Sequence, residues 1–374
     1  MTIGIDASRA NHAQKTGVEW YAFFVIQELK KIIPSNIQVI LYSDVPLVGD
    51  IAVLPSNWCS KVLFWPPHRF WTQIRMSWEM LIHPPDVLFI PAHVFPFIHP
   101  KKTVMTVHDI AGVKFPHSYN WFERWYSTWS SKYAAKKLWQ IIVPSEFTKK
   151  ELVDFIGLDS VHSEHIHVVE HGYDERFHES VSEEKKKDIL KKYAITEPYL
   201  LSIGRLEEKK NTWRIIKAFE QVKQNPLYAD YQLVLVGQPG FGYERVKQVL
   251  DMSLVKKDIL TPGWVGKDDL PGLLQNAQAF VFPSLYEGFG IPVLEAFASR
   301  TPCIVSQGSS LEEVGGSAVE VVDPLSEDAL AQGIVRVLSE KEETAKKVEQ
   351  GRQRVLQFSW TKSTQQVFEI LRKK

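Results

Sequence analysis

The sequence predicts an α/β protein built from two doubly wound, Rossmann-like domains, each with a parallel sheet between layers of helices. Short apolar runs alternate with longer helical patterns from one end of the 374-residue chain to the other. The runs are apolar throughout, as expected for strands that are buried on both faces of a parallel sheet. Because the pattern fills two blocks of similar length, we expect two domains that face each other across a central cleft.

In the first block, seven runs are predicted as strands and three segments as helices. The last of these helices has the clearest start, because Ser145 is a good N-cap and Glu146 places a carboxylate in the first turn. The strands are expected at Thr2–Ala7, Ile37–Ser43, Val62–Trp65, Val87–Pro91, Thr103–Val107, Gln140–Val143 and His165–Val169. The helices are expected at Thr16–Lys31, Asn120–Lys137 and Ser145–Ile156.

The second block repeats the alternation of strands and helices. A polar, charged stretch runs from Glu179 to Lys185 and indicates the domain boundary, which we place after residue 175. The strands are expected at Tyr199–Ile203, Gln232–Val236, Ala279–Phe282, Cys303–Ser306 and Val319–Val322. The helices are expected at Thr212–Lys223, Tyr243–Leu254, Asp268–Asn276 and Pro292–Ser299.

Composition excludes several classes of protein. The formal net charge is zero, which argues against a nucleic-acid binder. The two cysteines, Cys59 and Cys303, are far apart and indicate neither a disulfide framework nor a zinc site. The N-terminus turns polar at once, and the most apolar window, residues 86–100, is short and broken by prolines. We therefore expect a cytoplasmic protein, with peripheral membrane contact left open.

The predicted helix Asn120–Lys137 carries an unusual number of aromatic side chains, and two interpretations stay open. The first is an amphipathic helix that faces the core. The second is an interfacial face that touches lipid headgroups or a lipid-linked acceptor. The aromatic and basic residues at issue are Trp121, Phe122, Trp125, Tyr126, Trp129 and Tyr133, with Arg124, Lys132, Lys136 and Lys137.

Ligands of open parallel sheets bind beyond the carboxyl ends of the strands, so polar and glycine residues after the predicted strands are candidate site residues. One predicted strand ends at Gly204, and Arg205 follows at its edge. Lys210 stands just before a helix that Asn211 or Thr212 caps. Two cations beside a helix N-terminus favour a diphosphate, although a solvated charged turn explains the segment equally well.

Two further strand ends offer weaker candidates. Gly237 follows a strand, where a glycine permits the close approach of a ligand or simply makes a turn. Trp264 and Val265 follow Pro262-Gly263, where an aromatic side chain and backbone groups would hold a nucleobase. A tryptophan in the core is the other interpretation of Trp264.

The most informative segment runs from Glu287 to Glu295. Glu287 is expected on a loop after a strand, and Gly288 and Gly290 allow the backbone to come close to a ligand. Pro292 suits a first helical turn, which puts Glu295 about one turn into the helix. A carboxylate accepts two hydroxyl hydrogen bonds, and the first N–H groups of a helix favour phosphate, so the segment predicts a site for a sugar diol and a diphosphate.

At these residues the chain resembles the family 4 (group 1) glycosyltransferases, which have the GT-B fold. Their signature is a Glu-x7-Glu pair around Gly-Phe-Gly, together with a Gly-Arg…Lys-Asn segment. Further matches at residues 16–18, 108–109, 143–148 and 309–314 extend the resemblance over nearly the whole chain. The pattern from Phe358 to Leu371 looks like the family's C-terminal helix, which crosses back onto the first domain. The resemblance thus implies domains of residues 1–175 plus 358–374 and of residues 176–357.

The resemblance also implies roles for individual residues. Glu295 should bind the donor ribose, and Glu287 should bind a hydroxyl of the transferred sugar. Arg205 and Lys210 should neutralise the leaving diphosphate. His108 should face the transferred sugar from the first domain. The other positions expected to contact the donor are Gly17, Gly204, Gly237, Trp264, Val265, Gly288, Phe289, Gly290, Ile291 and Leu294.

This chain departs from the family pattern at two places. Residues 171–174 read His-Gly-Tyr-Asp where the family often has Asn-Gly-Val-Asp, and Glu312 stands where the family often has proline. Neither position belongs to the donor signature.

The expected reaction moves a hexose from GDP-mannose or a UDP-sugar to a glycan or lipid-linked acceptor with retention of configuration. No Asp-x-Asp motif occurs, so neither a metal nor another cofactor is predicted. Two alternatives remain: a sugar-nucleotide epimerase of the same architecture and a sugar-binding protein without catalysis.

Overall fold

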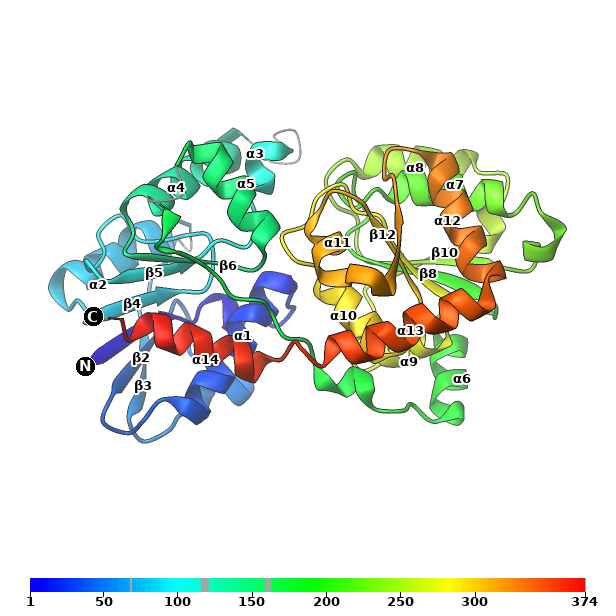
Figure 1. Cartoon of the computed structure of the whole chain (residues 1–374). Helices are drawn as coiled ribbons and strands as arrows, with labels where there is room; N and C mark the ends of the chain where they lie inside the picture. Colours follow the sequence, from blue (N-terminus) through cyan, green and yellow to red (C-terminus); the bar gives the residue numbers. More distant parts are fainter. Residues whose placement is uncertain (68, 116–120, 159–162, 374) are drawn as a thin grey trace. The chain divides into compact units, whose positions relative to one another are not determined.

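The computed structural model describes residues 1–67, 69–115, 121–158 and 163–373. The chain forms two compact units (Figure 1). The first is built from Met1–Lys114, Trp121–Gly172 and the C-terminal segment from Phe358, and the second from Tyr173–Gln357. Each unit has its own parallel sheet with helices on both faces, as the sequence predicts.

The sheet of the first unit has seven strands in the order β3-β2-β1-β4-β5-β6-β7, and every neighbouring pair is parallel. The strand order reverses between β1 and β4, which makes this pair the switch point of a doubly wound sheet. The strands are β1 Thr2–Asp6, β2 Gln38–Ser43, β3 Trp58–Val62, β4 Val87–Ile90, β5 Thr103–Thr106, β6 Gln140–Val143 and β7 Ile166–Val168.

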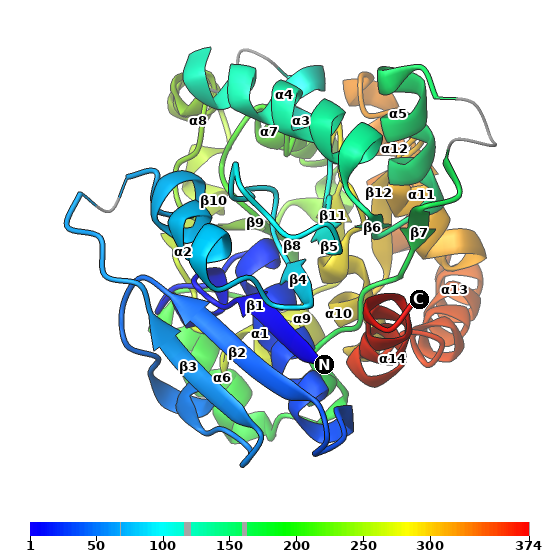
Figure 2. The same cartoon turned by 90° about the vertical axis from the view of Figure 1, so that its left-hand side faces the viewer.

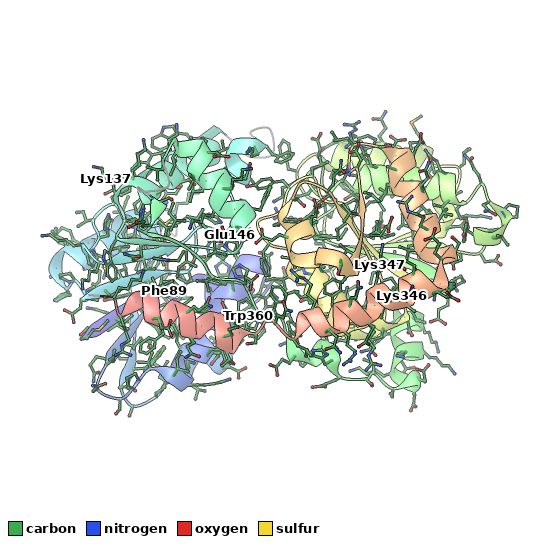
Figure 3. The ribbon with its side chains drawn as sticks, viewed as in Figure 1. Phe89, Lys137, Glu146, Lys346, Lys347 and Trp360 are labelled. Carbon is green, nitrogen blue, oxygen red and sulfur yellow. The ribbon has the colours of Figure 1, made fainter. Side chains whose placement is uncertain are left out.

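Helices from distant parts of the sequence cover this sheet. The last of them, α14, packs on α1, and the chain before it runs so close to Gly172 that a Cβ there would lie 2.2 Å from the Trp360 nitrogen. Trp360 stacks on Phe24 of α1, with ring centroids 5.2 Å apart, and is labelled at the start of α14 in Figure 3. The helices are α1 Gly17–Ile32, α2 Ser77–Ile82, α3 Ala111–Lys114, α4 Trp121–Lys137, α5 Glu146–Ile156 and α14 Trp360–Leu371, with the short η1 Arg9–Asn11 and η2 Gly49–Ala52 and the π-helical η3 Trp71–Met76.

The second unit has a six-stranded parallel sheet in the order β10-β9-β8-β11-β12-β13, which reverses between β8 and β11. The strands are β8 Tyr199–Ile203, β9 Gln232–Val236, β10 Ile259–Gly263, β11 Ala279–Phe282, β12 Cys303–Ser306 and β13 Val319–Val322. The helices are α6 Glu183–Lys192, α7 Thr212–Val222, α8 Tyr243–Met252, α9 Leu270–Asn276, α10 Ile291–Ala298, α11 Ser310–Gly315, α12 Glu327–Ser339 and α13 Lys341–Val355, with the short helices η6 Glu175–His178, η7 Pro226–Tyr228, η8 Lys256–Asp258 and η9 Gly316–Ala318.

Several elements differ from the sequence prediction. The third strand lies at Trp58–Val62 rather than at Val62–Trp65, because its backbone pairs with β2, and only its first residue, Trp58, is buried. β10 was not predicted as a strand. The charged stretch interpreted as the domain boundary leads into α6, which Ser182 caps and Ile189 anchors against α9. Such a helix escapes a search for apolar periodicity because it buries a single side chain.

The predicted cap of α5 is confirmed, since the Ser145 Oγ accepts the N–H of Thr148 at 3.0 Å. In α4, Tyr126 is buried, and Trp129 and Tyr133 stack against Phe95, so this part of the helix faces the core. Residue 120 and the side chains at positions 121, 122 and 124 lie outside the described part of the chain. No helix of that part is long and apolar enough to cross a bilayer.

Candidate functional site

The predicted phosphate and carboxylate segments follow the two strands at the switch point of the second sheet. Arg205 comes just after β8, and Glu287 lies on the loop after β11. β8 and β11 are adjacent and parallel, so their carboxyl ends meet at one edge of the sheet. The sequence placed both segments after strands. The strand order brings them together at the position where doubly wound sheets bind ligands.

Two glycines hold the backbones after β8 and β9 in close contact. Gly204 has φ 155° and Gly237 has φ 146°, conformations that other residues rarely adopt. A Cβ on Gly237 would lie 1.9 Å from the carbonyl oxygen of Gly204. Contact between two backbones therefore accounts for the glycine at position 237, and the predicted contact between Gly237 and a ligand stays a prediction.

The two predicted cations have different surroundings. Arg205 is exposed, and no carboxylate of the described residues lies within ion-pair distance of it. Lys210 forms an ion pair with Glu287, and these side chains are only 20% and 13% exposed. The Lys210 ammonium also lies 5.0 Å from the centre of the Phe282 ring. The structure thus joins Lys210, predicted for the phosphate, to Glu287, predicted for the sugar.

Asn211 fixes the loop that carries Arg205 and Lys210. It occupies the N-cap position of α7 in a left-handed conformation, φ 61°, but its side chain does not cap the helix. Of the two predicted capping residues, Asn211 thus holds the N-cap position, but it makes no side-chain capping bond. Its Nδ2 donates instead to the carbonyls of Pro283, at 3.1 Å, and Pro324, at 2.7 Å. A backbone bond from Leu285 N to Lys209 O, at 2.8 Å, adds a second link between the loops after β8 and β11.

The loop that carries Glu287 is held from α11. The Ser310 Oγ lies 2.8 Å from the carbonyl oxygen of Glu287 and 3.0 Å from that of Phe289. Ser306, at the end of β12, donates to the carbonyl of Ser284 at 2.6 Å. These hydroxyl groups orient the backbone of the loop and leave the Glu287 carboxylate to face Lys210.

The loop ends at the N-terminus of α10. Gly290 stands at the N-cap with φ 113°, and a Cβ there would lie 2.4 Å from the Leu311 side chain. No described side chain caps this helix, so the N–H of Ile291 is left for a ligand or for water. The side chains of Phe289 and Leu294 are buried, so these two residues support the loop from beneath.

Glu295 lies on α10, one turn after the N-terminus, and is partly buried. Burial, with a smaller contribution from the nearby negative charge of Asp174, raises the pKa of its carboxyl to about 8. Arg176 opposes this shift, but its guanidinium is engaged by Asp174, at 2.9 Å from Nε, and by Asp268, at 2.7 Å from Nη1. Glu295 is therefore largely protonated at neutral pH.

Trp264 follows β10, and 46% of its surface is exposed, so it is not the core tryptophan of the second interpretation. Val265 is buried, with only 3% of its surface exposed. β10 lies beside β9 at the end of the sheet, and the backbone bond from Gly237 N to Gly263 O, at 2.9 Å, links the two strand ends. The exposed indole is thus two strands away from β8, along the edge that carries Arg205.

The first unit holds the other two predicted site residues. Gly17 is the first residue of α1, exposed, with open space where a Cβ would lie. His108 follows β5, and its ring packs against Tyr21 of α1, with centroids 4.7 Å apart. Burial lowers the pKa of His108 to about 3, so the ring is neutral. Its Nε2 lies 3.0 Å from the Pro91 carbonyl, which only accepts, so Nε2 carries the proton and Nδ1 a lone pair.

Sequence reasoning did not assign the residues that position the site their observed roles. Asp174 and Arg176 set the charge around Glu295, and Asn211, Ser306 and Ser310 hold the loops. Ser310 lies in a segment that matched the family, but the match gave it no role. Within the described ranges, no three His, Cys, Asp or Glu side chains are grouped so that they could hold a metal ion.

Two family models match the chain and together cover most of it. The model described as "Glycosyl transferases group 1" matches residues 183–354. The model described as "Glycosyltransferase Family 4" matches residues 16–177. The first match lies within the second sequence block, and the second match covers the first block and ends two residues past its expected boundary.

Curated relatives share part of their length with this chain. It is 34% identical to the O-antigen chain mannosyltransferase B of Escherichia coli over 179 residues, which is 48% of this chain and 47% of the relative. It is 27% identical to the O-antigen chain mannosyltransferase RfbU of Salmonella typhimurium over 74% of this chain and 71% of the relative. A galactosyltransferase of Escherichia coli, "UDP-Gal:alpha-D-GlcNAc-diphosphoundecaprenol alpha-1,3-galactosyltransferase", is 27% identical over 63% of this chain and 60% of its own length. The chain thus spans about half the length of the first of these relatives.

Solved structures resemble the chain over its full length. A sucrose-phosphate synthase from Thermosynechococcus elongatus matches with a TM-score of 0.76 at 18% identity, over 100% of this chain and 98% of that one. The Anabaena protein HepE, solved with UDP and glucose, matches with a TM-score of 0.74 at 15% identity, over 100% and 99%. At these identities the likeness shows the fold alone, which is GT-B.

Proposed function

Because the chain belongs to the group 1, family 4 glycosyltransferases, we propose that it moves a hexose from a nucleotide-diphosphate sugar to a glycan or lipid-linked acceptor, with retention of configuration. The names of the relatives support O-antigen or similar cell-surface polysaccharide synthesis, with GDP-mannose or a UDP-sugar as donor. They do not favour the epimerase or the sugar-binding protein.

The observation that carries this proposal is the meeting of Arg205, Lys210 and Glu287 at the switch point of the second sheet. A leaving nucleotide diphosphate develops negative charge, which two cations and a helix N-terminus stabilise. A charge-assisted hydrogen bond is worth roughly 1.5–3 kcal/mol, so Arg205 and Lys210 together account for roughly 10²–10⁴ in rate if both bonds strengthen in the transition state.

The ion pair between Lys210 and Glu287 suggests how the two side chains divide the donor between them. The donor phosphate replaces Glu287 as the partner of Lys210, and the released Glu287 carboxylate accepts a hydroxyl of the transferred sugar. Glu295 accepts the ribose diol, and the N–H of Ile291 donates to the sugar or the phosphate.

The first unit supplies the acceptor side of the reaction. His108, as a neutral ring with a lone pair on Nδ1, accepts a hydrogen bond from a sugar hydroxyl rather than donating a proton. A Cβ on Gly17 would meet open space at the start of α1, and the proposal gives this position the role of approaching the donor phosphates. The leaving phosphate takes the acceptor proton on the same face of the sugar, and no metal ion takes part. Peripheral contact with a membrane completes the proposal for a lipid-linked acceptor.

Release of nucleotide diphosphate, measured with and without acceptor, tests the proposal. A transferase releases it in step with acceptor glycosylation, an epimerase yields isomerised donor, and a binding protein yields neither. Lys210→Ala should reduce turnover by roughly 10–10²-fold, because it removes one charge-assisted bond. Lys209→Ala is the matched control, because Lys209 holds the loop through its main-chain carbonyl, which alanine keeps. Equal activity of the two variants would remove Lys210 from the mechanism.

A further inference from the structure

Position 171 is one of the two places where this chain departs from the family pattern, and the proposed function gives its histidine no role. The His171 side chain is buried, with 4% of its surface exposed. Its ring stacks on Trp360, with centroids 5.7 Å apart, and lies 4.6 Å from the ring of Tyr21. Tyr21 belongs to α1, and Figure 3 labels Trp360 at the start of α14. His171 therefore contacts both of these helices, which are far apart in the sequence.

The rings of Tyr21 and His171 also pack against His108. The Tyr21 ring meets the His108 ring edge-on, with centroids 4.7 Å apart, and the His171 ring lies 5.5 Å from it. Tyr21 is itself held in place, because its hydroxyl group lies 3.0 Å from the hydroxyl of Thr106 on β5. The His108 Nε2 donates to the carbonyl of Pro91 after β4, the strand that lies beside β5 in Figure 2. Two aromatic neighbours and one backbone acceptor thus fix the plane of the His108 ring.

The charge state of the two histidines follows from their burial. Burial, with a smaller contribution from His93 after β4, lowers the pKa of His108 to about 3. Asp109, the next residue, and Glu19 on α1 act in the opposite direction, and their contributions are smaller than that of burial. Burial also lowers the pKa of His171, and the neighbouring His108 contributes to this shift. Both rings are therefore neutral at neutral pH, and the exclusion of water is what keeps His108 in this form.

We propose that His171 is a positioning residue, which holds the His108 ring in a fixed, water-free orientation by direct contact and through Tyr21. Loss of the His171 ring would leave a space beside His108 that water can enter, because the site has polar groups to bind it. A hydrated His108 would bind a proton near its usual pKa of 6.5. It would then lose the Nδ1 lone pair that accepts the sugar hydroxyl, a role of His108 that rests on the proposed function.

His171→Asn tests this proposal, because asparagine lacks the ring and is the residue that the family often has. The Cε1–H signals of the full chain, labelled with ¹³C-histidine, are followed by NMR between pH 5 and pH 8 without substrate. The His108 signal is identified by its loss in His108→Gln. In the unaltered chain it should not titrate, whereas in His171→Asn it should titrate within this range. A His108 signal that stays constant in His171→Asn would overturn the proposal.

His171→Phe is the conservative variant, because phenylalanine keeps a flat apolar ring and cannot ionise. It should leave His108 without titration, as in the unaltered chain. His83→Gln is the matched control, since His83 at the end of α2 is 65% exposed and precedes β4 rather than following it. It should leave the His108 signal unchanged, and circular dichroism melting checks that each variant is folded. Titration of His108 in the phenylalanine variant as well would refute the role of the His171 ring in excluding water.

Turnover gives a second readout. The assay measures release of nucleotide diphosphate from saturating GDP-mannose or UDP-galactose, with octyl α-mannoside as the acceptor probe. A ring with a pKa of 6.5 is neutral in roughly one molecule in thirty at pH 5. From pH 7.5 to pH 5, His171→Asn should therefore lose roughly threefold to thirtyfold more activity than the unaltered chain or His171→Phe. Affinity for GDP and UDP should be the same in all three. Turnover of neither donor would count against the proposed function alone, because the titration of His108 is measured without substrate.

Discussion

Replacing Glu295 with glutamine should make the stability of the protein less dependent on pH. Burial and Asp174 raise the pKa of Glu295 in the folded chain, so the folded state binds this proton more tightly than the unfolded state does. Between the usual value of 4.5 and the folded value of about 8, the unfolded carboxyl is ionised and the folded one is not. Stability is therefore lost as the pH rises through this window, and glutamine, which does not ionise, removes the loss.

The size of the effect follows from the two pKa values. With a pKa of about 8 in the folded chain, ionisation of Glu295 lowers the free energy of unfolding of the unaltered protein by about 4 kcal/mol between pH 5 and pH 9. Water reaches part of the Glu295 side chain and relaxes this cost, so we expect about 2–4 kcal/mol. At pH 5 the neutral carboxyl and the amide are nearly isosteric, and the two proteins should differ little.

Urea unfolding followed by circular dichroism at pH 5 and pH 9 measures this difference. Glu295→Gln should gain about 2–4 kcal/mol over the unaltered chain on going from pH 5 to pH 9. Glu244→Gln on the exposed face of α8 is the control and should gain nothing. A gain by Glu295→Gln no larger than that of the control would refute the assignment of a buried, protonated Glu295. Because nucleotide binding through the ribose needs the carboxylate, affinity for nucleotide diphosphate should also rise as the pH passes 8.

Three further predictions concern the loops and the first unit. Gly237→Ala should destabilise the second unit by at least about 2–3 kcal/mol in thermal or urea unfolding, because its Cβ would overlap the Gly204 carbonyl. Gly308→Ala is the control: Gly308 also has a positive φ but lies in open space, so this variant should lose only about 1 kcal/mol. Asn211→Ala should cost about 2–3 kcal/mol by the same measurement, since the carbonyls of two loops lose a buried donor, and an unchanged midpoint would contradict this role. His108→Ala should lower turnover more than it lowers affinity for free nucleotide diphosphate. The pH profile of activity between pH 5 and pH 8 should not change, because the His108 ring is neutral throughout this range. An equal loss of nucleotide binding in calorimetry would contradict the contact between His108 and the transferred sugar.

Much of the fold was readable from the sequence, since strands buried on both faces leave apolar runs without polar alternation. β1, β2, β4, β5, β6 and β7, and every strand of the second unit except the unpredicted β10, fall within two residues of their predicted bounds. The exceptions have a common cause. β3 is an edge strand that exposes most of its side chains, and α6 buries only Ile189, so pairing and docking, rather than composition, define them.

For the candidate site, the sequence by itself determined which residue types follow which strands: the glycines, the two cations and the two carboxylates. Only the tertiary structure decided how they act on one another. The order β8-β11 brings Lys210 to Glu287 across 77 positions of sequence, and η6 brings Asp174 and Arg176 to Glu295. The physical reason is that a side chain's charge state and partner depend on burial and on neighbours distant in sequence, whereas its place after a strand depends only on the local pattern.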